Sequence, residues 1–293
     1  MRSRAILVVM AAACFGTPLL FARPQQPPQP QPSPNRGVQV GVPDGRGGRP
    51  AGPGRQALPP PGPAPRNASG RVLLGGATAA QKGVWLPGGG GGQSVTEGVT
   101  VPFQPWAQAV ATDRVANQLE PHTRCKPSGI TRQFLTPYGV EIVEIADLQR
   151  VYIFDIGGPH TYRTIYLDGR THPATLGPSY YGHSIGWWEG DTLVVDTRGF
   201  NESFWLDRRG SPHTSALHTV EKFTRTNSRT IRYEITFDDR GAYTRPWGSS
   251  FNLSWEDGTE LFEYQCQESN YADNLMLGAM KAVDRATQSQ IVP

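Results

Sequence analysis

The segment 182–201, GHSIGWWEGDTLVVDTRGFN, constrains the fold more than any other part of the chain. GHSIG matches the G-x-S-x-G pattern that, in α/β-hydrolases, holds a nucleophilic serine, here Ser184, on a sharp turn from a strand into a helix. After this serine, however, two tryptophans lead into the turn residues 189–191 and then into the β-branched run TLVVDT. This order predicts strand, turn and strand, so the segment favours a β-hairpin.

The position of the histidines also argues against a serine hydrolase. The hydrolase triad needs an acid and then a histidine well downstream of the serine. The last histidine of this chain is His218, which leaves too little chain for the intervening sheet.

Strand-like patterns continue from residue 139 toward the C-terminus. The runs are VEIVEIAD, RVYIFDI, YRTIYLD, TLVVDT, LHTVEKFTRT, RTIRYEITFD and TELFEYQC, and turn pairs such as Asp168-Gly169 separate them. In residues 231–237, apolar and polar side chains alternate, as one buried and one wet face require. We therefore expect a mainly β fold, an antiparallel up-and-down barrel resembling the lipocalins, with a β-sandwich as the alternative.

The first 22 residues resemble a secretory signal peptide. Arg2 and Arg4 precede an apolar run that ends near Phe21. Gly16 and Pro18 interrupt this run, which favours a removable signal over a permanent membrane span. The sequence therefore predicts export to the periplasm or the medium, with lipid anchoring at Cys14 as a lesser alternative.

Residues 23–100 are rich in proline, glutamine and glycine, and such composition buries too little apolar surface to form a core. We expect a disordered linker there and a single β-rich domain over 101–293. Pro105 starts a predicted helix that places Trp106, Val110, Val115 and Leu119 near one face.

Charge divides the chain unevenly. Ten of the 28 basic residues but only two of the 25 acidic ones lie in residues 1–100, which leaves 18 basic and 23 acidic residues, a net charge of −5, in the remainder. An acidic domain argues against nucleic-acid binding, which requires a basic face. The basic leader is either a solvated spacer or a contact for an anionic envelope surface.

Removal of the signal peptide would leave two cysteines, Cys125 and Cys266. In an oxidising compartment we expect them to form a disulfide, with two buried free thiols as the alternative. Neither has a second cysteine at C-x-x-C spacing, which disfavours a metal or redox centre.

Several spaced motifs resemble a family of secreted bacterial proteins that have no assigned reaction and occur in many copies in some soil and aquatic species. The motifs are YLDGRTHP, GHSIGWWEGDTLVVDT, GFN, WLD, SPH, YTRPW and EYQC, spread over about residues 105–270. The resemblance implies an exported β-rich protein and supplies no catalytic residue. Its cysteine positions match Cys125 and Cys266, which supports their pairing, and the long Pro/Gly-rich leader departs from it.

Five histidines lie between residues 160 and 218, and no two have the spacing that places metal ligands on one strand or helix face. We therefore predict no metal and no cofactor, although a site assembled from separate strands stays open. General acid–base chemistry is a second possibility, with His183 or His218 as the titrating group and Asp196 or Glu221 orienting the ring. We expect Asp196 to point into the barrel; the alternative is that it caps a turn or pairs with Arg198.

The aromatic residues suggest a third hypothesis, that the protein has a ligand cavity. Large rings are numerous enough to line a cavity or to fill a wide core. Trp187 and Trp188 are adjacent in a predicted strand and should face opposite ways. The residues that we assign to ligand binding are Trp188, Trp205, Asp207, His213 and Trp247. The sequence thus favours a protein that binds a small apolar or aromatic molecule, with a His/Asp-dependent hydrolase or isomerase in the same cavity as the alternative.

Overall fold

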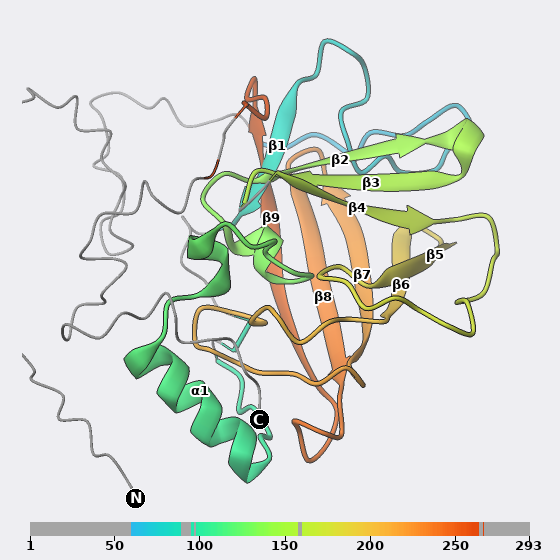
Figure 1. The fold of residues 1–293 in the computed structure, drawn as a ribbon. Coiled ribbons are helices and arrows are strands. Elements are labelled where there is room, and N and C mark those ends of the chain that lie inside the picture. Colours follow the sequence, from blue (N-terminus) through green and yellow to red (C-terminus); the bar gives the residue numbers. More distant parts are fainter. Residues whose placement is uncertain (1–59, 89–94, 97, 158–159, 264–265, 267–293) are drawn as a thin grey trace, which may run out of the picture. The chain divides into compact units, whose positions relative to one another are not determined.

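A computed structural model describes residues 60–88, 95–96, 98–157, 160–263 and 266. Within them, nine strands form one closed barrel in chain order, and β9 pairs back with β1 (Figure 1). The strands are β1 (Gly83–Pro87), β2 (Val140–Ile145), β3 (Arg150–Asp155), β4 (Thr161–Tyr166), β5 (His183–Glu189), β6 (Thr192–Arg198), β7 (His218–Asn227), β8 (Thr230–Asp238) and β9 (Trp247–Asp257). The helices are α1 (Pro105–Asn117) and the short 3-10 turns η1 (Pro121–Arg124), η2 (Arg132–Leu135) and η3 (Ala146–Leu148). The predicted barrel is confirmed, while the predicted signal peptide and Cys14 lie outside the described residues.

An odd number of strands explains the one parallel pair in the barrel. Strict antiparallel alternation around a closed ring needs an even number of strands, so a nine-stranded ring must contain a parallel neighbour. That neighbour is β4–β5, joined by only two residue pairs, while all other neighbours are antiparallel. Parallel strands need a crossover connection, so residues 167–182 must run back along the barrel before β5 begins. Figure 1 shows this loop swinging out beyond β4.

The barrel begins before residue 101, inside the segment expected to be linker. β1 closes the ring by pairing with β9 over five residue pairs. Trp85 is fully buried, and its Nε1–H donates to the carbonyl oxygen of Leu74 at 2.8 Å. The apolar islands around these residues are too short to predict a strand from sequence, because only pairing with β9 provides the burial that stabilises them.

The last strand also differs from the prediction. TELFEYQC was expected to be a strand, but the described residues 259–263 form none, and β9 occupies 247–257. Its inward side chains include Phe251 and Leu253, which face Tyr233 and Ile231 of β8. Serine, asparagine and glycine alternate with them, so β9 carries a weaker apolar signal than TELFEYQC.

The hairpin prediction for residues 182–201 is confirmed. β5 and β6 pair in register from His183↔Arg198 to Glu189↔Thr192, and Gly190 adopts φ +60° in the turn. Ser184 lies inside β5, is fully buried, and is followed by strand rather than helix. The geometry of a hydrolase nucleophile is therefore absent at this serine.

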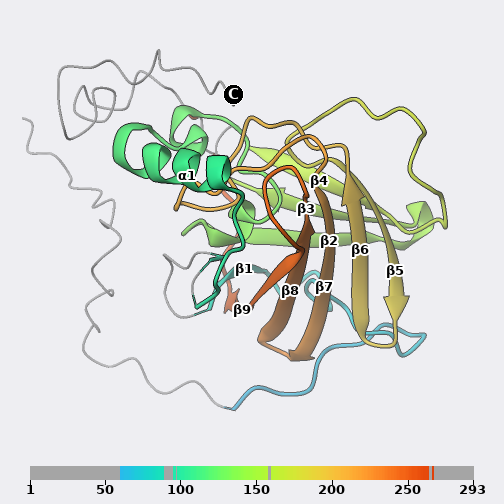
Figure 2. The same ribbon diagram turned by 90° about the horizontal axis from the view of Figure 1, so that it is seen from below.

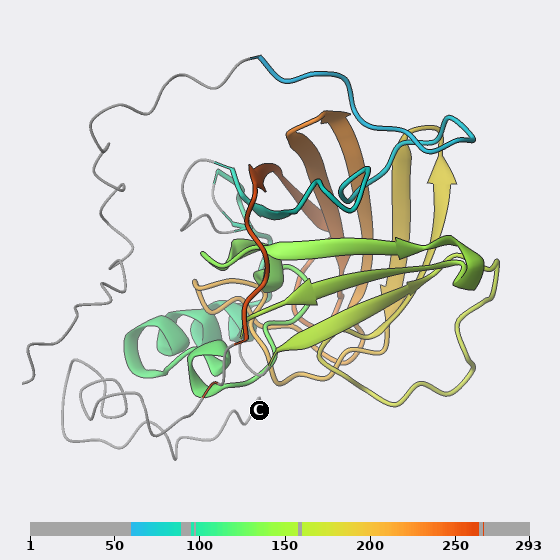
Figure 3. The same ribbon diagram turned by 90° about the horizontal axis from the view of Figure 1, so that it is seen from above.

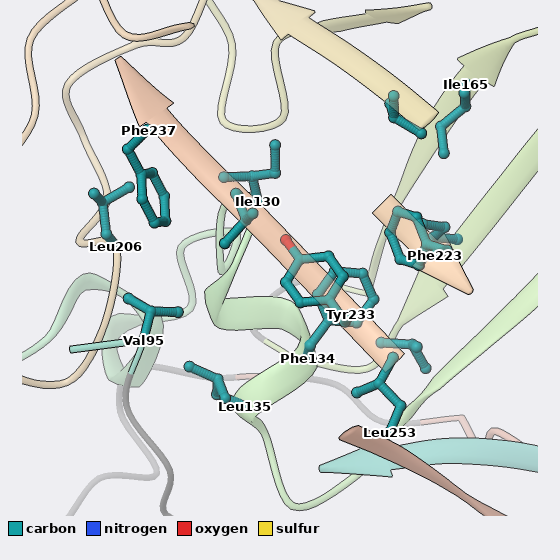
Figure 4. Close-up of a cluster of buried hydrophobic side chains, with 14 of the residues drawn as sticks. Val95, Ile130, Phe134, Leu135, Ile165, Leu206, Phe223, Tyr233, Phe237 and Leu253 are labelled. Carbon is teal, nitrogen blue, oxygen red and sulfur yellow. The ribbon is translucent and has the colours of Figure 1, made fainter. Parts of the chain in front are cut away.

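The interior of the barrel is filled by side chains. The alternating residues 231–237 of β8 bury Ile231, Tyr233, Ile235 and Phe237, as predicted. The segment containing η2 enters the ring, and Phe134 packs against Tyr233 and Phe223 at ring-centroid distances of 4.8 and 5.7 Å (Figure 4). This packing makes the interior a solid core where the sequence led us to expect a ligand cavity.

Helix α1 lies outside the barrel wall (Figure 2). It forms where predicted, but its buried residues are Ala107, Ala111 and Arg114, whereas Val115 is 61% exposed. The reason is a close approach of backbone: a Cβ on Gly210 would lie 2.9 Å from the carbonyl oxygen of Ala111. Small side chains are needed at that contact; of the predicted face, Trp106 packs against the core, whereas Val115 is turned away from it.

The predicted disulfide is present between Cys125 and Cys266, which are 141 positions apart in the chain. It connects the segment that follows α1 with the segment that follows β9. None of the helices in the described part of the chain is long and apolar enough to cross a membrane.

Candidate functional site

Strand register places three predicted site residues on the outer wall of the barrel. Ile185 of β5 and Val220 of β7 both pair with Asp196 of β6, so His183 and His218 are its diagonal neighbours on the same face. The inward residues of β6 are Leu193, Val195 and Thr197, all fully buried. The expectation that Asp196 points into the barrel was therefore wrong. In β6 the inward-facing positions are the odd-numbered residues, so the even-numbered Asp196 faces outward.

The crossover loop 167–182 brings a fourth residue, His172, to this group. The end of the loop is anchored beside β6 by hydrogen bonds from Ser179 N to Gly199 O and from Asn201 N to Ser179 O. Gly199 adopts φ +77°, and a Cβ there would lie 2.9 Å from the side chain of Leu176. The loop therefore packs directly on the wall and lays His172 over Asp196.

The four side chains form one hydrogen-bonded chain. The Nε2 atoms of His172 and His218 lie 2.7 and 2.6 Å from the two carboxylate oxygens of Asp196. The Nδ1 atoms of His172 and His183 face each other at 2.9 Å. The side chains of His172, Asp196 and His218 are 15%, 17% and 29% exposed, so the group is sheltered but reaches solvent. We call these four residues the His–Asp cluster.

Asp196 is the fixed negative charge of the cluster. Partial burial of the carboxyl pushes its pKa upward, but hydrogen bonds from His218 and His172 and the nearby positive charge of Arg198 outweigh burial, and the pKa falls to about 2. The Arg198 Nε atom lies 3.5 Å from the carboxylate, so the pair with Arg198 that the sequence left open does form. An ionised carboxylate only accepts hydrogen bonds, so both Nε2 atoms facing it carry protons.

This donor arrangement fixes where the free lone pairs lie. His218 donates through Nε2, so its neutral form keeps a lone pair on Nδ1. When His172 is neutral, its Nδ1 accepts a hydrogen bond from the Nδ1–H of His183, which leaves a lone pair on Nε2 of His183. The cluster thus presents two basic nitrogens oriented by one carboxylate, which is the arrangement that general-base catalysis uses.

His183 is held by a stack of aromatic and cationic groups. Its ring stacks on Tyr166 with centroids 5.3 Å apart, and the guanidinium of Arg170 lies 3.9 Å from the Tyr166 ring centre. Partial burial, together with the neighbouring His172 and Arg170, lowers the pKa of His183 below its ordinary value. The imidazole is therefore neutral at physiological pH and available as a base.

Ser184 and Glu221 lie on the opposite side of the same strands, in the core. Arg163 forms a bidentate ion pair with Glu221 and donates from Nε to Ser184 Oγ at 3.0 Å. Tyr233 also donates to Glu221, at 2.8 Å. Glu221 therefore does not orient His183 or His218, and the Ser184 hydroxyl is occupied by structural hydrogen bonds.

Four of the five residues assigned to ligand binding are buried. Trp205, Asp207 and His213 are buried in the loop between β6 and β7, and Trp247 stacks on Phe237 within the core. The Asp207 carboxylate accepts a hydrogen bond from Thr96 Oγ1 at 2.8 Å, and burial lowers the pKa of His213 to about 4. Their environment is that of packed structural residues.

The two adjacent tryptophans face opposite ways, as predicted. Trp187 is 43% exposed on the outer wall, whereas Trp188 packs against the core with the Arg71 guanidinium 4.5 Å from its ring. An open surface groove follows β8 and β9, and its lining contains none of the five assigned residues; it comprises Gly98, Val99 and residues 234–236 and 248–250.

No set of three or more His, Cys, Asp and Glu side chains in the described ranges is arranged to hold a metal ion. Comparison with protein-family models, curated proteins and solved structures finds no match. The site must therefore be interpreted from its own geometry.

Sequence reasoning identified three members of the cluster and missed His172, Tyr166 and Arg170. All three lie in the motif YLDGRTHP, which was noted only as part of a resemblance. Its closeness to the next motif, GHSIG, was a usable signal, but the parallel crossover that folds one motif over the other could not be read from local patterns.

Proposed function

We propose that this chain is an exported β-barrel protein whose His–Asp cluster performs general acid–base chemistry, as a hydrolase or isomerase. The observation that carries the proposal is the pair of hydrogen bonds from His172 and His218 to the single carboxylate of Asp196. Export rests on the signal-like N-terminus and on the Cys125–Cys266 disulfide, which suits an oxidising compartment.

In the proposed reaction, His218 Nδ1 removes a proton from water or from an acidic C–H group of the substrate. Asp196 stabilises the imidazolium that forms, and the same ring returns the proton to the leaving group or product. A hydrolase would use water as its nucleophile, because the nearby hydroxyl of Ser184 faces the core.

The test uses p-nitrophenyl acetate, an ester that imidazole bases cleave readily. His218→Ala and Asp196→Asn should lower saturable turnover about 10²–10⁴-fold, the usual contribution of a positioned acid or base. The matched control is His160→Ala, because His160 is exposed and lies outside the cluster; it should change turnover by less than about twofold. Equal turnover in all four proteins would refute the proposal.

A second candidate is a binding protein for a small apolar or aromatic molecule. This proposal is supported by Tyr162 on the outer wall, which is 61% exposed. A binding protein should keep its ligand affinity when His183, Asp196 and His218 are replaced one at a time by alanine, whereas the enzyme should lose turnover and retain binding.

A further inference from the structure

The outer faces of β3 and β4 carry a group of aromatic rings, in which Tyr162 is 61% exposed and Tyr152 and Phe154 are half-buried. Tyr152, Phe154 and Tyr162 contact one another with ring centroids 6.0 to 6.1 Å apart. Ile145 and Leu148, at the turn between β2 and β3, are 38% and 51% exposed. Figure 3 shows β2, β3 and β4 side by side on one side of the barrel. Exposed apolar surface of this kind marks a binding surface.

The rings continue into the His–Asp cluster. Tyr166, the last residue of β4, shares the outer face with Tyr162 and stacks on His183. We call Tyr152, Phe154, Tyr162 and Tyr166 the aromatic strip. Because His183 contacts His172, one unbroken series of side chains leads from the strip to Asp196.

Guanidinium groups lie beside the aromatic strip. Arg150 and Arg170 lie 5.3 and 3.9 Å from the Tyr166 ring centre, and Arg198 stands beside Asp196 with 56% of its side chain exposed. Each guanidinium has five donors in a fork that matches a carboxylate. Arg170 is ion-paired with Asp168 through Nε and Nη2, which leaves Nη1, and Arg150 donates from Nη1 to the hydroxyl of Tyr152 at 3.5 Å, which leaves Nη2. Donors remain for an anionic ligand.

The shape of this surface favours an extended ligand over a compact one. Strands β3 and β4 each have six residues, a length of about 20 Å at 3.3 Å per residue. A sugar ring has an apolar face of C–H groups and a rim of hydroxyls, which match a tyrosine ring and its polar tip. A purely apolar ligand would instead leave the tyrosine hydroxyls and guanidinium donors without partners.

We propose that the aromatic strip and its arginines bind an acidic polysaccharide. Sugar rings stack on Tyr162 and Tyr152, and carboxylates on the sugars pair with Arg150 and Arg170. The chain then passes over the His–Asp cluster, and on the proposed function above the polysaccharide is the substrate.

The experiment is affinity electrophoresis of the full chain through gels that contain polygalacturonate, with dextran as the neutral control polymer. Polygalacturonate should retard the wild-type protein, and Tyr162→Ala should weaken that affinity about tenfold through the loss of one stacking ring. Arg150→Gln should weaken it and reduce its dependence on salt. Trp187→Ala is the matched control, because it removes an exposed ring of β5 outside the strip, and it should leave retardation unchanged.

Four results would overturn the inference. Equal retardation of the wild type and Tyr162→Ala would assign polyanion binding to the basic leader, which both proteins retain. Equal retardation by dextran would remove the role of the carboxylates, and loss of binding in Trp187→Ala would move the surface away from the strip. His218→Ala should bind the polysaccharide like the wild type. Ester turnover by a protein that does not bind the polysaccharide would refute this inference and leave the acid–base proposal standing.

Discussion

The two faces of strands β5, β6 and β7 carry polar groups in opposite circumstances. On the inner face, Arg163, Glu221, Ser184 and Thr197 hydrogen-bond to one another in full burial. On the outer face of the same strands lies the partly exposed His–Asp cluster, in which His183 and Asp196 directly precede Ser184 and Thr197. The inner groups have used their hydrogen-bonding capacity on each other. The outer imidazoles keep lone pairs directed away from Asp196, so only the outer face can take part in chemistry.

The difference between the inner and outer groups shows that the face on which a polar strand residue lies must be known before a function is assigned to it. Three carboxylates give a graded test of the comparison. Glu221 is buried with a cation, Asp155 is buried beside the hydroxyl of Tyr181, and Asp196 is partly exposed between two imidazoles.

The largest effect is expected from Glu221→Ala. The substitution leaves the Arg163 guanidinium buried and unpaired, which should lower the free energy of unfolding by about 3–5 kcal/mol in urea denaturation. The double variant Arg163→Met, Glu221→Leu removes both charges and should recover most of that loss. A cost below about 1 kcal/mol for the single change would mean that the inner network is not the rigid region described here.

The next effect concerns Asp155, whose carboxyl accepts a hydrogen bond from Tyr181 at 2.7 Å. Burial raises its pKa to about 7, against the lowering effects of Tyr181 and the Gly157 backbone. The folded state thus binds the proton more tightly than the unfolded state, so stability should be greatest below about pH 4 and fall as the pH rises to about 7, by at most about 1.4 kcal/mol per pH unit.

Asp155→Asn should flatten this pH dependence when urea unfolding is measured between pH 4.5 and 8. The control is Asp191→Asn, because Asp191 is an exposed carboxylate paired with Arg66. An unchanged slope in Asp155→Asn would show that the proton resides on another group.

The smallest effect is expected from Asp196→Asn. Its depressed pKa means that the carboxylate stabilises the folded state above the unfolded value near pH 4, and that this contribution disappears as the pH falls toward 2. Because solvent screens a partly exposed group, we expect a cost of about 1 kcal/mol at pH 7. The difference in thermal unfolding between the wild type and the variant should vanish near pH 2. A large loss of stability at pH 7 would mean that the cluster stabilises the fold, as the inner network does, and would contradict the difference between the two faces.

Several parts of the fold could be predicted because their signals are local. The β5–β6 hairpin follows from a turn sequence between two β-branched or aromatic runs, and the inner face of β8 follows from alternation alone. β1 and β9 were missed or misplaced because their stability comes from pairing with neighbouring strands, β1 with β2 and β9, and β9 with β8 and β1. His183, Asp196 and His218 were identified as candidates from residue type. Their position on the outer face of the barrel was not predicted.

By itself, the sequence determined the β-rich class, the hairpin that excludes a serine nucleophile, and the buried positions of β8, because strand alternation and turn chemistry act over a few residues. Only the tertiary structure decided that Asp196 faces outward, that Phe134 fills the interior, and that His172 joins the cluster. A shift of one residue in strand phase reverses the face of every side chain. A closed ring of nine strands requires a parallel neighbour, but only the tertiary structure places it at β4–β5, where the crossover brings His172 to the cluster.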